Sequence, residues 1–185
     1  TSGMANVGAR GAWVYNAQWT LKTTGHEIGH NFGLPHAGAW DTDDGSVIGP
    51  GSVWDYGNVF DMMGVGSASA FQRHFGPTFK QYLDWIPMSD VTKITTDGST
   101  TSRIRAMDKV QADGNKRALA VDRAGSTDDY WVEYRQLFGT SIGLRDGVLV
   151  NWADINGGYQ QPLLLDMEPD TFQKDDAVLP MGKTF

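Results

Sequence analysis

Three of the four histidines of this chain lie within eleven positions, in the stretch TTGHEIGHNFGLPHAGAW of residues 23–40. His26 and His30 are four residues apart, which on an α-helix places their side chains about 40° apart around the axis and about 6 Å apart along it. For His36 to join them, the helix must end and the chain must turn back sharply. Gly33 is the residue type that most easily takes the positive φ that such a turn requires. The spacing therefore predicts a helix that ends near this glycine and three imidazoles that face one point.

The residue after the first histidine, Glu27, indicates that a metal bound here could take part in catalysis. Glu27 follows His26 by about 100° around the helix, so its carboxylate can flank a metal ion without binding it. In the pattern H-E-x-x-H, two imidazoles one turn apart bind zinc and the glutamate is the general base. The longer string H-E-x-x-H-x-x-G-x-x-H is completed by a methionine turn. YGNVFDMMGVG, residues 56–66, supplies Met63 directly before Gly64. So many matching features disfavour a purely structural role for the histidines.

Composition restricts the partners and the metal ligands. The chain has 185 residues and no cysteine, which excludes disulfides, thiolate metal sites and cysteine nucleophiles. Any metal must therefore be held by histidine, carboxylate or backbone oxygen. The formal net charge of −7 argues against nucleic acid as a partner, because nucleic-acid binders carry a basic patch. No apolar run is long enough to span a bilayer, so a membrane partner is not expected either.

A shift in composition near residue 90 divides the chain into a zinc-binding region, residues 1–90, and a β-rich module, residues 91–185. In the first region we expect a glycine-broken strand over 4–15, a helix over 19–32, a glycine- and aspartate-rich loop over 38–57 and a helix over 78–83 that starts at Pro77. In the second region turn signals separate short strands, which are expected at 91–95, 102–107, 117–122, 130–136, 147–152 and 161–165. The sequence predicts an α+β fold whose second part is antiparallel.

These motifs resemble those of the gametolysin-like branch of the metzincin zinc peptidases. HEIGHNFGLPHA is similar to the zinc helix and turn of that family, and YGNVFDMMG is similar to its YGDPFDVMG-type methionine turn. FKQYLDW resembles the segment after the turn, and DYWVEYRQ, GVLVNWAD and LLLDMEP resemble the downstream β region. The resemblance implies a metzincin-type zinc helix and methionine turn, the C-terminal part of a catalytic domain, followed by an antiparallel β-rich module.

The resemblance also implies roles for individual residues. The zinc ligands would be His26, His30 and His36. Glu27 would be the general base, Met63 would form an apolar floor beneath the histidines, and residues 4–14 would form an edge strand along which a peptide substrate lies antiparallel. The implied function is a zinc-dependent endopeptidase that acts on protein or peptide substrates. A zinc amidase, an exopeptidase and a non-catalytic binding module with a structural zinc remain open as alternatives.

Two features depart from the family pattern. Some metzincins carry a tyrosine two residues after the methionine, and here that position is Val65. Only 25 residues precede His26, whereas the family has a sizeable sheet-and-helix region there. Either an upstream segment of the same precursor is a partner on another chain, or the upstream part has been lost, or the fold is unusually reduced. The first residues lack the basic start and apolar stretch of a signal peptide, so we expect a secreted protein in a processed form.

A second candidate metal site lies in the loop WDTDDGS, where three aspartates precede Gly45: Asp41, Asp43 and Asp44. Several carboxylates and a glycine turn are partly like a calcium loop, but the spacing departs from the EF-hand pattern and no bidentate glutamate follows. We favour an ordinary solvated loop and keep calcium as the alternative. The fourth histidine, His74, has no partner pattern and is expected not to bind metal.

Overall fold

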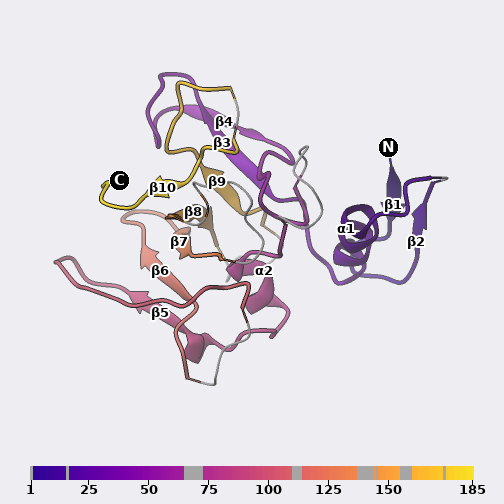
Figure 1. Ribbon diagram of the computed structural model, residues 1–185, viewed down its shortest axis with the longest axis horizontal. Helices are drawn as coiled ribbons and strands as arrows, with labels where there is room; N and C mark the ends of the chain where they lie inside the picture. Colours follow the sequence, from indigo (N-terminus) through magenta and orange to yellow (C-terminus); the bar gives the residue numbers. More distant parts are fainter. Residues whose placement is uncertain are drawn as a thin grey trace.

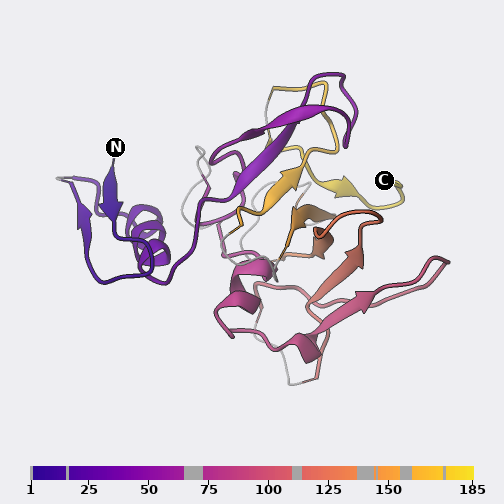
Figure 2. The same cartoon turned by 180° about the vertical axis from the view of Figure 1, so that it is seen from behind.

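A mixed β-sheet forms the main body of the molecule, and α1 with strands β1 and β2 lies to one side of it (Figures 1 and 2). The computed structural model describes residues 2–15, 17–64, 73–109, 114–136, 144, 146–154, 160–172 and 174–185. The described helices are α1 (Leu21–Asn31), α2 (Pro77–Tyr82) and the 3₁₀ turn η2 (Met88–Asp90). The described strands are β1 (Gly3–Ala5), β2 (Ala12–Val14), β3 (Gly38–Thr42), β4 (Gly51–Trp54), β5 (Val91–Ile94), β6 (Ala118–Asp122), β7 (Asp129–Glu133), β8 (Gly147–Ala153), β9 (Leu163–Leu165) and β10 (Leu179–Pro180).

The large sheet has the strand order β4-β3-β9-β8-β7-β6-β5, and β10 pairs with β8. The neighbours from β6 to β9 are antiparallel, as expected. However, β5 is parallel to β6, so the expectation of an antiparallel module is wrong at this pair. β9 also pairs parallel with β3, a strand of the first region. Parallel neighbours require a long crossover, and the pattern within a strand does not reveal its partner. The fold is α+β, mostly sheet with few helices, as predicted.

Two segments of the first region are hairpins, which the sequence reading missed. Residues 4–15 were expected as one broken strand, but β1 pairs antiparallel with β2 across a turn. Residues 38–57 were expected as a loop, but β3 and β4 pair antiparallel there and only 43–50 form the turn. Gly51 contributed to the expectation of a loop, but it lies in β4. A Cβ at this position would collide with the backbone of β3, so the close pairing of the two strands requires a glycine here.

Both expected helices are confirmed, but the strand expected at 102–107 is not. Both predicted helices are present, and Pro77 occupies the first turn of α2. Residues 102–107 form no strand, because isolated backbone hydrogen bonds hold them in place of a ladder: Arg105 N–H donates to Lys116 O at 2.7 Å and Met107 N–H to Tyr134 O at 2.7 Å.

The sheet takes strands from both sides of residue 90, because β3 and β4 belong to the first region. One core cluster joins Ala39 of β3, Leu149 of β8 and Leu164 of β9 to Phe60, which precedes the predicted methionine turn. A second cluster surrounds Trp131 of β7, whose side chain is fully buried. Packing thus places the segment around residue 60 against the sheet. No helix in the described ranges is long and apolar enough to cross a bilayer.

Candidate metal centre

Helix α1 carries the first two histidines and the glutamate. Thr20 caps its N-terminus by accepting a hydrogen bond from the Thr23 N–H at 3.0 Å, which satisfies one of the free donors of the first turn. The helix ends at Asn31, and Gly33 takes a φ of +92°, the left-handed conformation that turns the chain back. His36 thereby meets the two helical histidines. One ring nitrogen from each of the three lies within 4.8 Å of the others, so the structure brings the three predicted ligands together.

Each of the two helical histidines is held through its Nδ1 atom. His26 Nδ1 lies 3.1 Å from the Met62 carbonyl oxygen, and His30 Nδ1 lies 2.8 Å from the Leu34 carbonyl oxygen. A carbonyl oxygen can only accept, so Nδ1 carries the proton in both rings and Nε2 keeps its lone pair. Such outer partners are the usual means of orienting a metal-binding imidazole.

The two Nε2 atoms of these rings face each other at 3.1 Å. Two lone pairs at this distance repel unless a cation lies between them, so this contact is the observation that tests the fit of a metal. Nitrogen ligands about 2.0–2.1 Å from a tetrahedral zinc lie about 3.3 Å from one another. The residues present therefore fit a zinc ion held by His26, His30 and His36.

The electrostatics of the site favour neutral imidazoles. Burial lowers the pKa of His26 to about 4, against the hydrogen bond to the Met62 carbonyl, which raises it. Burial also lowers the pKa of His36, although the Asp55 carboxylate beside it acts in the opposite direction. Because neutral imidazole is the form that binds metal, these two ligands are ready to bind at neutral pH without first losing a proton.

Glu27 points into the same cleft. It is buried, and its carboxylate packs against β1, where a Cβ on Gly3 would lie only 2.5 Å from Glu27 Oε1. Burial raises the pKa of the Glu27 carboxyl, while the neighbouring His30 lowers it. A carboxylate whose pKa is raised toward neutrality is suited to accept and return a proton.

Met63 is completely buried and lies against α1. It packs with Leu34, Ala37 and Phe79, and its carbonyl oxygen accepts a hydrogen bond from the Ala37 N–H at 3.0 Å. At Gly29, on α1, a Cβ would collide with Met63 Sδ. A glycine in a helix costs about 0.5–1 kcal/mol relative to alanine, and here its lack of a side chain lets the methionine reach the helix.

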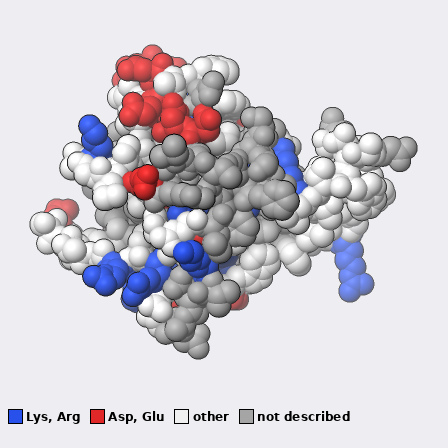
Figure 3. Space-filling model, in the orientation of Figure 1, with Lys and Arg blue, Asp and Glu red and all other residues white. Residues whose placement is uncertain are grey.

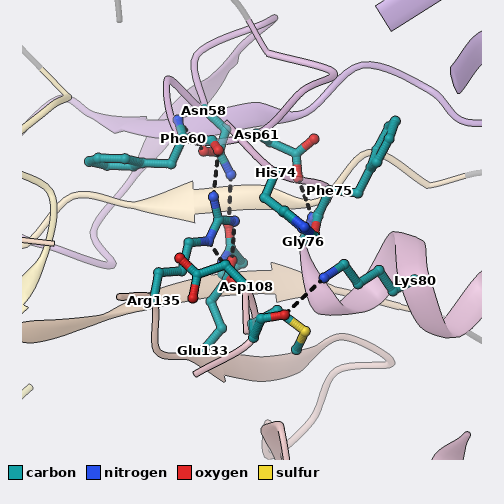
Figure 4. A network of polar contacts seen from close by, with 12 residues as sticks. Asn58, Phe60, Asp61, His74, Phe75, Gly76, Lys80, Asp108, Glu133 and Arg135 are labelled. Carbon is teal, nitrogen blue, oxygen red and sulfur yellow. Dashed lines mark hydrogen bonds and ion pairs between the residues drawn. The ribbon is translucent and has the colours of Figure 1, made fainter. Parts of the chain in front are cut away.

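A buried polar network holds the segment around residues 60–63 in place (Figure 4). The Asp61 carboxylate accepts hydrogen bonds from the N–H groups of Met63 at 2.8 Å and Gly76 at 2.7 Å. Arg135, which follows β7, donates a hydrogen bond to the Phe60 carbonyl at 2.6 Å. It also forms a bidentate ion pair with the Glu133 carboxylate, at 2.8 and 2.7 Å. Sheet and metal site are thus connected through residues 60–63.

The sequence reading did not identify the residues of this network. Asp61 stands two residues before Met63, a spacing at which an aspartate commonly bonds to the backbone, so its role could have been anticipated. Glu133 and Arg135 alternate along the chain and each is 1% exposed. Their burial could not be read locally, because charged residues are almost never fully buried unless they are paired.

The cleft above the histidines has a volume of about 510 Å³. One wall is β1, whose residues Gly3, Met4 and Ala5 line it, and the opposite side includes Tyr56 and Gln161. β1 pairs on one side with β2, and it lies beside the metal site. Of the predicted edge strand over 4–14, only Met4, Ala5 and Val7 line this cleft, and the substrate role of this strand stays a prediction.

Tyr56 was also missed by the sequence reading. Its ring lies 3.5 Å from that of His36 and 5.7 Å from that of His26, centroid to centroid. Its φ is +62°, a conformation that is uncommon for a residue with a side chain and costs about 1–3 kcal/mol. Burial raises the pKa of its phenol, and the charges of Asp55 and Glu27 act in the same direction.

The candidate calcium residues are spread apart. Asp41 lies on β3 and pairs with Lys174 Nζ at 3.0 Å, while Asp44 accepts from Ser46 N–H at 3.0 Å and from Ser46 Oγ at 2.6 Å. Asp43 is exposed, and exposed carboxylates of this turn belong to an acidic end of the molecule (Figure 3). Within the described ranges, only the three-histidine group brings three potential metal-binding side chains within 4.8 Å of one another. Calcium binding stays a prediction.

His74 and Val65 are the remaining positions that the sequence singled out. His74 lies away from the three-histidine group: its Nδ1 is 3.2 Å from the Phe75 carbonyl oxygen, and its backbone bridges to Asp61. Val65 lies outside the described residues. Comparison with protein-family models, with curated proteins and with solved structures finds no match to this chain.

Proposed function

We propose that this protein is a zinc-dependent endopeptidase, with α1 as a metzincin-type zinc helix and residues 60–64 as its methionine turn. The observation that carries the proposal is the pair of Nε2 lone pairs, on His26 and His30, that face each other at 3.1 Å in a cleft that also holds Glu27. A metal bound only for structure has no need of a carboxylate general base, so this glutamate favours a catalytic site over a structural zinc.

The chemistry follows from the cleft. Zinc, when bound by the three histidines, would lower the pKa of a bound water molecule and polarise the carbonyl group of the scissile peptide bond. Glu27 accepts a proton from the attacking water as the water oxygen bonds to the carbonyl carbon. The C–N bond then breaks, and Glu27 returns the proton to the leaving amine nitrogen. Water is consumed and its two hydrogens end on the new carboxyl and amine groups.

The substrate class follows from the wall of the cleft. An extended peptide can add to an exposed strand edge through main-chain hydrogen bonds, which do not depend on side-chain identity. β1 lines the cleft beside the histidines, so a peptide laid along it would present a backbone carbonyl near Glu27. This arrangement favours an endopeptidase over an amidase or an exopeptidase, since it binds backbone on both sides of the cut.

The test combines metal analysis with a protease assay. The purified chain should contain one zinc per molecule and cleave casein or gelatin, and a chelator should abolish cleavage until zinc is restored. Glu27→Gln should keep the zinc and lose about 10²–10⁴-fold in kcat. Glu168→Gln, the same change at an exposed glutamate, is the matched control and should keep full activity. Chelator-insensitive cleavage or an active Glu27→Gln variant would refute the proposal.

A further inference from the structure

The third histidine differs from the other two in its outer partner. His26 and His30 lie on α1 and bond to backbone carbonyls. His36 lies beyond the helix, its side chain is 26% exposed, and its Nδ1 is 3.2 Å from both carboxylate oxygens of Asp55. The helix therefore does not fix the ring of His36, and a carboxylate takes over the task that backbone carbonyls perform for the other two.

Asp55 is itself exposed, with 58% of its side chain accessible. An exposed carboxylate on a turn samples several rotamers unless other groups hold it. Here the Tyr56 N–H donates to Asp55 Oδ1 at 3.1 Å, and the Gln161 Nε2 amide donates to the same oxygen at 2.6 Å. The Tyr56 ring covers the face of His36. Asp55 is thus held from two sides, and one of them is a side chain far away in the sequence.

Gln161 reaches the site because of the parallel pairing of β3 and β9. It is 106 residues from Asp55 and directly precedes Pro162, whose carbonyl accepts the Gly38 N–H at 2.9 Å. Leu163 then pairs with Gly38. A Cβ on Gly38 would lie 3.0 Å from Gln161 Nε2, so the glycine leaves room for the amide. The pairing that the sequence did not reveal is what places Gln161 at the cleft.

We propose that Gln161 and Asp55 are positioning residues for the third metal ligand. Gln161 orients the Asp55 carboxylate, and Asp55 holds Nδ1 of His36 protonated and its Nε2 free to bind. The relay joins the β3–β9 pair to the metal centre, so the second half of the chain takes part in building the site. This inference rests on the zinc site proposed above.

The test is a double-variant cycle with zinc affinity as its readout, measured by competition with a chromophoric chelator. Asp55→Ala should weaken zinc binding by about 10–100-fold, the usual effect of removing an outer partner of a ligand. Gln161→Ala should weaken it in the same direction by a smaller factor. In the Asp55→Ala background, Gln161→Ala should have no further effect, because the amide acts only through the carboxylate.

Two further measurements separate positioning from a general loss of structure. In the cobalt(II)-substituted protein, Asp55→Ala and Gln161→Ala should change the visible absorption bands, which report the geometry of the ligands. The metal-free variants should unfold at the same temperature as the metal-free wild type. Gln160→Ala, at the exposed neighbouring glutamine, and Asp97→Ala, at an exposed aspartate, are matched controls that should leave affinity and spectrum unchanged.

The outcomes separate this inference from the proposed function. If the wild type binds zinc and the cycle gives the expected result but no peptide is cleaved, the peptidase proposal fails and the positioning role stands. If zinc-dependent cleavage is found but Gln161→Ala leaves affinity and spectrum unchanged, or acts equally with and without Asp55, the positioning role is overturned and the peptidase stands. A wild type that binds no zinc overturns both.

Discussion

Met63 occupies the space that a side chain on Gly29 would need. A Cβ built on this glycine would overlap Met63 Sδ and would lie 3.2 Å from Phe75 Cε1. Met63 is completely buried, so its thioether has no open space into which to move. The helix that carries His26 and His30 therefore depends on a glycine in its interior, because only a bare backbone lets Met63 lie directly against it.

We expect Gly29→Ala to destabilise the protein, although alanine is the better helix former. The helix gain is about 0.5–1 kcal/mol, whereas forcing an extra methyl group into a packed core costs about 1–3 kcal/mol. The free energy of unfolding of the metal-free protein, measured in urea, should fall. Gly25→Ala is a graded control on the same helix, because its Cβ would lie 3.1 Å from Met62 Sδ and should cost less. Equal effects at both positions would contradict the packing argument.

Arg135 and Glu133 should behave as a coupled pair. Both are 1% exposed and bonded to each other, and Arg135 alone also holds the Phe60 carbonyl. Arg135→Met leaves the Glu133 charge buried without its partner, which costs about 3–5 kcal/mol. Adding Glu133→Leu should recover part of that loss, because the buried Glu133 charge is then removed as well. Chemical denaturation of the two single variants and the double variant gives the coupling energy, and strictly additive losses would show that the two side chains do not depend on each other.

The three-histidine group could be predicted because it is a local feature. His26, His30 and Gly33 act through helix geometry and the turn that ends it, and both depend only on near neighbours in the sequence. The α+β class and both helices follow from the same kind of local pattern. The outer partners of His26 and His36 could not be predicted, because Met62 and Asp55 reach these rings only through the tertiary fold. The partner of His30, the Leu34 carbonyl, lies only four residues away.

Gln161 illustrates this limit. Nothing in the residues around it points to a metal site, and its place at the cleft arises only when β9 lies parallel to β3. The same holds for Glu133, at the end of β7, and Arg135, which follows it: their alternation fits an exposed strand face until the turn at residues 60–63 packs on them. Local sequence therefore predicted the three-histidine group, while the contacts that orient His26 and His36 belong to the tertiary fold.

The metal-free protein should lose stability in acid partly through His74. Burial lowers the pKa of His74 to about 4, and the charges of Lys80 and Arg135 act in the same direction. Unfolded histidine titrates near 6.5, so between these values only the unfolded chain binds the proton. The stability due to neutral His74 is therefore full above about pH 6.5 and is lost as the pH falls toward 4, by at most about 3 kcal/mol.

The variant His74→Gln isolates this effect because glutamine does not titrate. Urea unfolding in the presence of a chelator should show a smaller loss of stability for the variant than for the wild type between about pH 7 and pH 4. The shift at His26, which burial also causes, is present in both proteins and cancels in the difference. Parallel curves for the two proteins would show that His74 does not titrate with a lowered pKa in the folded state.

Zinc should stabilise the folded chain by mass action, because the three imidazoles come together only in the folded state. Free zinc at about 100 times its dissociation constant adds about 2.7 kcal/mol to the free energy of unfolding, and a chelator should remove this gain fully. His36→Ala tests the origin of the effect, since this ligand is partly exposed and its loss disturbs the core less than loss of a helical histidine. The variant should unfold like the metal-free wild type and gain much less from zinc, whereas His74→Gln should gain as much as the wild type. Differential scanning calorimetry with and without zinc measures both, and an undiminished gain in His36→Ala would exclude this histidine from the ligand set.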